Sequence, residues 1–262
     1  GNVINYTLRD PIGIVACISP WNYPLHLLTW KISPALMMGN CVIAKPSEVT
    51  PMTAYLFSKL CIKAGLPKGV LNIIHGAGNN IGDEIVKHPK IKAISFTGGT
   101  KTGKTISKTA SSLLKKVSLE LGGKNPIIIF DDCNYDEMLS TTVRSSFGNQ
   151  GQICLCGERI FIQESIYNKF KKDFVKEAKK LKIGNPLKSN TNQGAMVSKE
   201  HYTKVLDYFD RARESGAKFI TGGKSKSVKG TCSEGWFIEP SIIENLDRNS
   251  DCYKEEAFGP VT

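Results

Sequence analysis

The feature that most constrains the fold is the alternation of short apolar runs and longer amphipathic segments along the first half of the chain. The apolar runs predict strands at residues 12–18, 41–44, 70–74, 93–96 and 117–121. The segments between them predict helices at residues 25–38, 51–64, 81–87 and 102–114. Apolar strands separated by helices are typical of a parallel sheet covered on both faces. We therefore predict an α/β fold, with a Rossmann-like parallel sheet over residues 1–122.

The pattern restarts after Gly122-Gly123, where we place a domain boundary. Further strands are predicted at residues 126–130, 159–163, 219–220 and 237–238, and helices at 135–148, 166–181 and 199–215. Residues 225–234 are polar and contain glycine, which predicts a surface loop. We expect residues 123–262 to form a second α/β domain, with a functional site in the cleft between the domains.

Composition excludes some classes of protein. The formal charge of +11 could suggest a nucleic-acid partner, but the lysines lie on predicted helix faces such as residues 169–182 without interleaved aromatic residues. A solvated surface is the better interpretation, so no nucleic-acid partner is expected. No apolar run approaches the length of a membrane span and the first residues form no signal peptide, so we expect a cytoplasmic protein without a membrane partner.

The eight cysteines are scattered, and no pair has the spacing CxxC. This pattern indicates a reducing compartment and no structural metal site. Cys17, Cys41 and Cys61 lie in apolar runs and are predicted to be buried thiols.

Two segments contain the residue types that covalent catalysis needs. Cys154 follows the polar, glycine-containing run of residues 149–152, and Glu120 lies just before Gly122-Gly123. A thiol must lose its proton to attack a substrate, and a base must then activate water to release the covalent intermediate. Taken singly, Cys154 is explained as well by a buried thiol, and Glu120 by a solvent-facing carboxylate.

Five segments in this order resemble the aldehyde dehydrogenase superfamily. They are residues 19–22 (Ser-Pro-Trp-Asn), 45–48 (Lys-Pro-Ser-Glu), 120–126 (Glu-Leu-Gly-Gly-Lys-Asn-Pro), 151–154 (Gly-Gln-Ile-Cys) and 256–260 (Glu-Ala-Phe-Gly-Pro). The resemblance implies a partial NAD-binding domain over residues 1–122 and a partial catalytic domain over residues 123–262. Because family members extend beyond both ends, we expect the chain to be a central fragment of a longer enzyme.

The resemblance also implies the roles of the catalytic residues. Cys154 corresponds to the nucleophile and Glu120 to the general base that activates the deacylating water. The side-chain amide of Asn22, with the backbone N–H of Cys154, would stabilise the oxyanion. Metal is not expected to take part.

NAD is the cofactor that the resemblance implies. The residues expected to bind it are Ile18, Pro20, Trp21, Lys45, Ser47, Glu48, Gly78, Phe96, Thr97, Gly98, Gly99, Thr102, Leu121, Glu256 and Phe258. A carboxylate at Glu48 would accept hydrogen bonds from ribose hydroxyls and repel a 2′-phosphate, which favours NAD over NADP.

A P-loop nucleotide hydrolase or kinase is the main alternative. Residues 98–105 satisfy G-x-x-x-x-G-K-[ST], and they follow a predicted strand and open a predicted helix. Residues 127–132 resemble a Walker B strand, whose aspartate would hold Mg²⁺. This alternative leaves the segments of Asn22, Glu48, Cys154 and Glu256 unexplained.

Two local patterns bear on the substrate, residues 18–32 and residues 144–156 with their Cys-Leu-Cys tripeptide. Within the superfamily they resemble most the branch that oxidises 2-aminomuconic semialdehyde in tryptophan (kynurenine) catabolism. Enzymes for betaine aldehyde or other semialdehydes share the general motifs and remain open alternatives. The resemblance further implies a small-molecule aldehyde substrate and a homo-oligomer, either a dimer or a tetramer.

Overall fold

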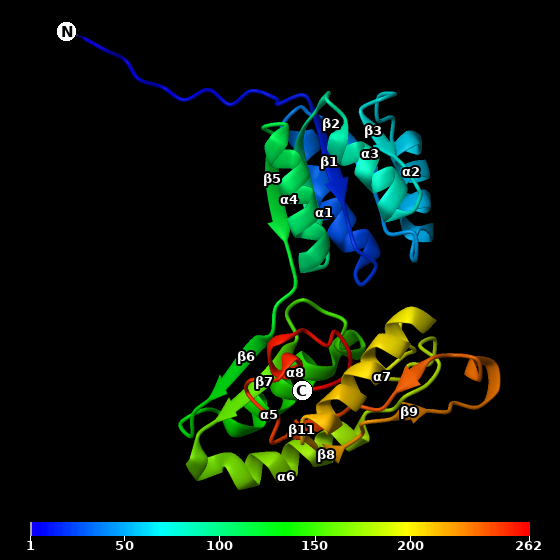
Figure 1. Cartoon of the computed structure of the whole chain (residues 1–262). Coiled ribbons are helices and arrows are strands. Elements are labelled where there is room, and N and C mark those ends of the chain that lie inside the picture. The colour runs from blue at the N-terminus through cyan, green and yellow to red at the C-terminus, as the bar shows by residue number, and fades with distance from the viewer. Residues whose placement is uncertain (1) are drawn as a thin grey trace. The chain divides into compact units, whose positions relative to one another are not determined.

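The computed structural model describes residues 2–262, which form two compact units that meet between Gly122 and Gly123 (Figure 1). Unit 1 is built on a five-stranded parallel sheet, and unit 2 contains three two-stranded sheets. The predicted α/β class with a parallel sheet is therefore confirmed. Within residues 2–262, no helix is long and apolar enough to cross a membrane.

The sheet of unit 1 has the strand order β3-β2-β1-β4-β5. Its strands are β1 (Ile14–Ile18), β2 (Cys41–Lys45), β3 (Leu71–Ile73), β4 (Ile91–Thr97) and β5 (Lys116–Glu120). The strand order reverses between β1 and β4, which both pair with parallel neighbours. In open α/β sheets, ligands bind outside the carboxyl ends of the strands at this point.

Helices cover both faces of this sheet, as its apolar strands predict. They are α1 (Pro24–Met37), α2 (Met52–Lys63), a π-helical turn (Gly78–Gly82), α3 (Asp83–Lys87) and α4 (Thr100–Ser112). Val15 and Cys17 of β1 pack with α1 and α2, whereas Ala16 and Ile18 pack with α3 and α4. Successive residues of one strand thus fill two separate cores.

The prediction that Cys41 is a buried thiol is wrong. Cys17 is buried and Cys61 is half-buried, but Cys41 is exposed. Cys41 is the first residue of β2, and its N–H donates to the carbonyl oxygen of Gly13 at 2.9 Å. Burial starts at the next residue, Val42, because the end of the strand is not covered by a helix as its middle is.

Unit 2 places its strands in pairs. They are β6 (Asn125–Ile129) with β7 (Gly157–Ile162) in parallel, and β8 (Lys218–Thr221) with β11 (Ile242–Glu244) and β9 (Ser225–Lys226) with β10 (Phe237–Ile238) in antiparallel. Its helices are α5 (Tyr135–Phe147), α6 (Glu164–Lys180), α7 (Lys199–Glu214) and α8 (Asp251–Lys254). The sequence did not predict β11 and α8, which are too short to show a periodic pattern.

Two apolar cores hold unit 2 together. In one, Phe174 of α6 stacks on Phe147 and Phe170 at centroid distances of 5.8 and 5.1 Å. The other surrounds Val205 and Phe209 of α7. The predicted surface loop at residues 225–234 is exposed over most of its length but contains the two residues of β9 and a short 3₁₀ turn, Gly230–Cys232.

Candidate functional site

A cavity of about 460 Å³ lies at the carboxyl ends of β1, β2 and β4 in unit 1. Twelve of the residues predicted to bind a cofactor line this cavity. These are Ile18, Pro20, Trp21, Lys45, Ser47, Glu48, Gly78, Phe96, Thr97, Gly98, Gly99 and Thr102. Because these residues come from separate stretches of the sequence, only the parallel sheet brings them to one edge.

Glu48 and Lys45 form an ion pair in the wall of this cavity. The Lys45 Nζ lies 3.0 Å from Oε2 of Glu48, and it also donates to the carbonyl oxygen of Pro46 at 3.1 Å. The other carboxylate oxygen of Glu48 accepts from the N–H of Gly78 at 3.4 Å. Partial burial raises the pKa of Glu48, but hydrogen bonds from backbone N–H groups and from Lys45 outweigh it, so the pKa lies below its ordinary value. Glu48 is therefore ionised at neutral pH.

Two buried hydroxyl groups in the cavity wall lack a hydrogen-bond partner among residues 2–262. They belong to Ser19 and Thr97, which are 4% and 8% exposed. Buried polar atoms without a partner are rare in folded proteins, and a ligand is one way to satisfy them. With the carboxylate of Glu48, they fit a ligand rich in hydroxyl and phosphate groups, such as a dinucleotide.

The N-terminal end of α4 faces the same cavity, through Gly98 and Gly99 just before the helix and Thr102 in its first turn. This helix has no acidic residue in its first turn and, within the described part of the chain, no side chain that caps its N-terminus. Its first backbone N–H groups are thus suited to an anion such as a phosphate.

The helix geometry contradicts the P-loop alternative. A Walker A loop stays unwound around the phosphates until its lysine. Here α4 already begins at Thr100, so Gly103 and Lys104 lie inside the helix. The hydroxyl of Thr105 donates to the carbonyl oxygen of Lys101 at 3.2 Å, as expected of a residue within a helix. Gly103 has a packing role instead, because a Cβ there would lie 2.4 Å from Leu121.

The sequence missed several residues that line the cavity. They are Ser19, Asn79, Gly82, Asp83, Val86, Lys101, Thr105 and Ile106. Four of them lie in the π-helical turn and α3, next to the predicted Gly78. The glycine-rich run of residues 76–82 was the available signal, but its spacing alone is weak. Leu121, also predicted to bind the cofactor, packs against the core that includes Ile106 and Ala110 of α4, and its role stays a prediction.

Asn22 and Glu120, two of the three predicted catalytic residues, belong to unit 1. Asn22 lies half-buried in the turn between β1 and α1, and Glu120 is the last residue of β5, with an exposed side chain. The backbone of Glu120 is fixed, because its carbonyl oxygen accepts from the N–H of Gly98 at 3.0 Å. The buried Lys31 of α1 donates to the hydroxyl of Ser95 at 3.2 Å. Burial lowers the pKa of Lys31, although the charges of Cys17 and Glu120 partly oppose this effect.

Cys154, the third, lies in a tight turn of unit 2 that follows α5. Asn149, Gln150 and Gly151 have positive φ angles of 49°, 57° and 70°, so three successive residues are left-handed. Such backbone strain is concentrated at functional sites. The amide of Asn125 holds the turn by donating to the carbonyl oxygen of Cys154 at 2.6 Å.

The two thiols of the Cys-Leu-Cys tripeptide differ in exposure. Cys154 is half-buried, whereas Cys156 is only 2% exposed. Burial raises the pKa of the Cys156 thiol to about 12, with smaller contributions from nearby Glu158, Cys154 and Glu256. Because only a thiolate is a good nucleophile, this raised pKa makes Cys156 a poor nucleophile at neutral pH. Of these two thiols, Cys154 thus belongs to the more exposed residue.

The segment that carries Glu256 and Phe258 packs against the same turn. A Cβ on Gly151 would lie 1.9 Å from the carbonyl oxygen of Gly259, so the two backbones touch where only glycine fits. Glu256 is half-buried, and burial, followed by the neighbouring carboxylate of Glu158, raises its pKa to about 7. Unit 2 therefore brings together Cys154 and the predicted cofactor residues Glu256 and Phe258.

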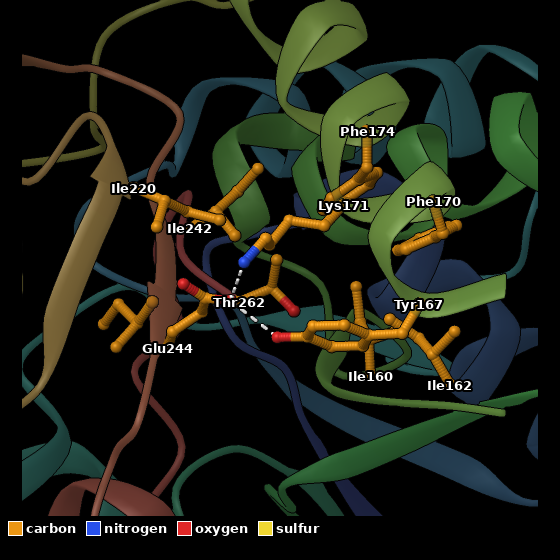
Figure 2. A pocket seen from close by; sticks show the side chains of 11 residues that line it. Ile160, Ile162, Tyr167, Phe170, Lys171, Phe174, Ile220, Ile242, Glu244 and Thr262 are labelled. Atoms are coloured by element: carbon orange, nitrogen blue, oxygen red, sulfur yellow. Dashed lines mark hydrogen bonds and ion pairs between the residues drawn. The ribbon is translucent and has the colours of Figure 1, made fainter. Parts of the chain in front are cut away.

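Figure 2 shows a different cavity of unit 2, of about 90 Å³, between β7, α6 and β11. Isoleucine and phenylalanine side chains form most of its lining. The carboxylate of Glu244 there accepts from Tyr167 Oη and from Lys171 Nζ, both at 2.6 Å. It contains none of the predicted catalytic or cofactor residues, so it is separate from the candidate site.

Comparison with known proteins identifies the family of the chain. The profile of the Aldehyde dehydrogenase family matches residues 1–262. The chain is 50% identical to 2-aminomuconic semialdehyde dehydrogenase of Homo sapiens over 99% of its length and 54% of that protein. It is 42% identical to betaine aldehyde dehydrogenase of Bacillus subtilis over 97% of its length and 52% of that protein.

Among solved structures, betaine aldehyde dehydrogenase of Staphylococcus aureus in complex with NAD+ superposes with a TM-score of 0.92. The two sequences are 41% identical, and the superposition covers 96% of this chain and 50% of the other. The chain thus spans about half the length of the curated relatives that it matches.

Proposed function

The chain belongs to the aldehyde dehydrogenase family, and from this premise we propose that the protein oxidises an aldehyde to a carboxylic acid with NAD. The observation that carries the proposal is the cavity of unit 1, which collects twelve residues predicted to bind the cofactor. A half-buried cysteine in a strained turn, Cys154, supports the same activity from unit 2.

The cavity supports NAD in preference to NADP. The ionised carboxylate of Glu48 would accept hydrogen bonds from the adenosine ribose, and it would repel a phosphate on the 2′-oxygen. The first turn of α4 would hold the pyrophosphate. The related structure with NAD+ supports this choice. When bound, NAD supplies the acceptor for the hydride that leaves the substrate.

We assign Cys154 to the attack on the carbonyl carbon of the aldehyde, which forms a thiohemiacetal. The side-chain amide of Asn22 and the backbone N–H of Cys154 would donate to the oxyanion. Loss of the aldehyde hydrogen as a hydride leaves a thioester on the sulfur. Glu120 would then take a proton from water, whose oxygen attacks the thioester and releases the carboxylate and the thiol.

For the substrate, we propose a semialdehyde such as 2-aminomuconic semialdehyde, which places the enzyme in tryptophan catabolism. The 50% identity to an enzyme named for this substrate supports the assignment. Betaine aldehyde is the second candidate, supported by the relative that is 42% identical. Initial rates with both aldehydes distinguish the two, and the larger kcat/KM identifies the preferred substrate.

The test of the reaction compares two cysteine variants of the whole protein. Cys154→Ser should abolish NADH formation, because a serine hydroxyl lacks the nucleophilicity of a thiolate, while the affinity for NAD in calorimetry should stay within about threefold of wild type. Cys156→Ser is the matched control two residues away, and it should retain activity because this thiol is buried. Near-normal turnover of Cys154→Ser would refute the assignment.

We also propose a cytoplasmic location, supported by the eight scattered cysteines, whose lack of any CxxC pair indicates a reducing compartment. The dimer or tetramer that the family resemblance implies stays a prediction, and light scattering of the purified protein would test it.

A further inference from the structure

A buried carboxylate holds the segment that carries Glu256 and Phe258. Glu158 of β7 accepts two backbone hydrogen bonds from this segment, from the N–H of Ala257 at 3.1 Å and from the N–H of Phe258 at 3.2 Å. The side chain of Glu158 is only 4% exposed. A carboxylate that accepts from two adjacent backbone N–H groups fixes the orientation of both peptide planes.

The charge of Glu158 is balanced by a buried lysine. The Lys124 Nζ lies 2.8 Å from Oε2 of Glu158, and its side chain is 7% exposed. Lys124 also donates to the hydroxyl of Tyr208 at 3.0 Å, and this hydroxyl donates to the carbonyl oxygen of Cys252 at 2.6 Å. Buried ion pairs add little net stability, so a pair with every polar atom directed at a partner indicates a role in fixing one conformation.

The held segment needs such support, because its backbone is strained. Phe258 has a φ angle of 55°, a left-handed conformation that is unfavourable for a bulky side chain. Its carbonyl oxygen lies 2.7 Å from Nε2 of His201, on α7. The N–H and the C=O of Phe258 are thus fixed from two different elements, Glu158 on one side and His201 on the other.

We infer that Glu158, with Lys124, is a positioning pair that holds Glu256 and Phe258 in the geometry for contact with the nicotinamide end of the cofactor. The inference rests on the proposed function, in which these two residues bind that end. Glu158 touches neither substrate nor cofactor in this assignment and acts only through the backbone of the segment. Its loss should therefore impair hydride transfer more than it impairs binding of the adenosine half of NAD.

The test uses Glu158→Gln in the whole protein. The amide side chain has nearly the same shape, but its NH₂ group cannot accept the second N–H and opposes the Lys124 ammonium. Glu244→Gln is the matched control in the same unit. Glu244 also pairs with a lysine and a tyrosine, Lys171 and Tyr167 (Figure 2), in a cavity that residues 256–258 do not line.

Two measurements report on the role. Hydrogen exchange of the Ala257 and Phe258 amides should accelerate about tenfold or more in Glu158→Gln, as the loss of a hydrogen bond to a charged group predicts, and stay unchanged in Glu244→Gln. The single-turnover rate of hydride transfer should fall about tenfold or more, while the dissociation constant for NAD changes less than about threefold. The first-order rate constant of this phase does not depend on the number of active molecules, so unfolded protein lowers the amplitude and leaves the rate unchanged.

Unchanged exchange at these two amides would overturn the inference, and so would an equal acceleration throughout unit 2, which indicates a merely structural role. If Glu158→Gln does not fold, Glu158→Asp supports the same comparison, because its shorter carboxylate keeps the charge but cannot reach both amides. Absence of NADH formation by the wild-type protein would refute the proposed function. The exchange data would still decide whether Glu158 holds the segment.

Discussion

Replacing Gly151 by alanine should loosen the turn that presents Cys154. Gly151 has a φ angle of 70°, and a Cβ at this position would lie 1.9 Å from the carbonyl oxygen and 2.3 Å from the carbonyl carbon of Gly259. Both contacts are with backbone atoms, so no side-chain rotation can relieve them. The chain must shift either the cysteine turn or the segment with Glu256 and Phe258.

The free-energy cost of Gly151→Ala has two parts. An alanine in a left-handed conformation costs about 1–2 kcal/mol. Forcing an extra carbon into a packed region costs about 1–3 kcal/mol more. Gly216 separates the two, because it has a φ angle of 82° but no atom of the described residues within 4 Å of the position that a Cβ would take, so Gly216→Ala carries only the first part. Gly151→Ala should therefore lower the free energy of unfolding of unit 2 by about 1–3 kcal/mol more than Gly216→Ala does.

The assay is the labelling rate of Cys252, whose thiol is 1% exposed in the core around Val205. When the protein recloses faster than the reagent reacts, this rate follows the population of the open state. The expected difference corresponds to labelling about fivefold to 150-fold faster in Gly151→Ala than in Gly216→Ala. Equal rates in the two variants would refute the argument, because they would show that the approach of Gly151 to Gly259 imposes no restriction.

Three further predictions concern unit 1 and the titration of Glu256. Glu120→Gln should leave a burst of NADH in rapid mixing but slow the steady state about a hundredfold or more, since a general base contributes that much; an equally slowed first turnover would assign Glu120 to an earlier step. Glu48→Ala should weaken NAD binding about tenfold in calorimetry, whereas Lys104→Ala should not change it, because Lys104 is an exposed residue within α4. Loss of nucleotide binding in Lys104→Ala, tested with NAD and with ATP–Mg²⁺, would instead favour a P-loop. The pKa of Glu256 is about 7 in the folded protein against an ordinary value of 4.5, so the unfolded state binds fewer protons between these values and stability should fall as the pH rises through this window. Glu256→Gln should flatten this fall in urea unfolding series, and an unchanged slope would contradict the assignment.

Local patterns in the sequence predicted much of the fold. The apolar runs of β1 and β4 are buried on both faces, and a parallel sheet between two helical layers is the arrangement that buries such strands. The helix predicted at residues 166–181 is α6, in which Phe170 and Phe174 are buried and most of the lysines are exposed. The resemblance to the aldehyde dehydrogenase family, based on five ordered segments, is confirmed by the match over residues 1–262.

Burial at the ends of helices and strands was harder to predict from the sequence. Cys41 lies in an apolar run like Cys17, but it is exposed because it stands at the first position of its strand. The run of residues 98–105 satisfies a P-loop pattern, but the start of α4 at Thr100 places its lysine inside a helix. In both cases the residue types are right, and the position within the element decides the outcome.

Which segments become strands and helices, and which residues are candidates for chemistry, could be predicted from the sequence because these properties depend on neighbours a few positions apart. Which distant segments meet became known only from the packed fold. Glu158 has the sequence context of an ordinary charged residue of a strand, yet it accepts hydrogen bonds from Ala257 and Phe258, 99 and 100 positions later in the chain. Nothing in the sequence around Gly151 indicates its contact with Gly259, although their backbones touch. Such contacts depend on how whole elements pack, and no periodicity along the chain encodes them.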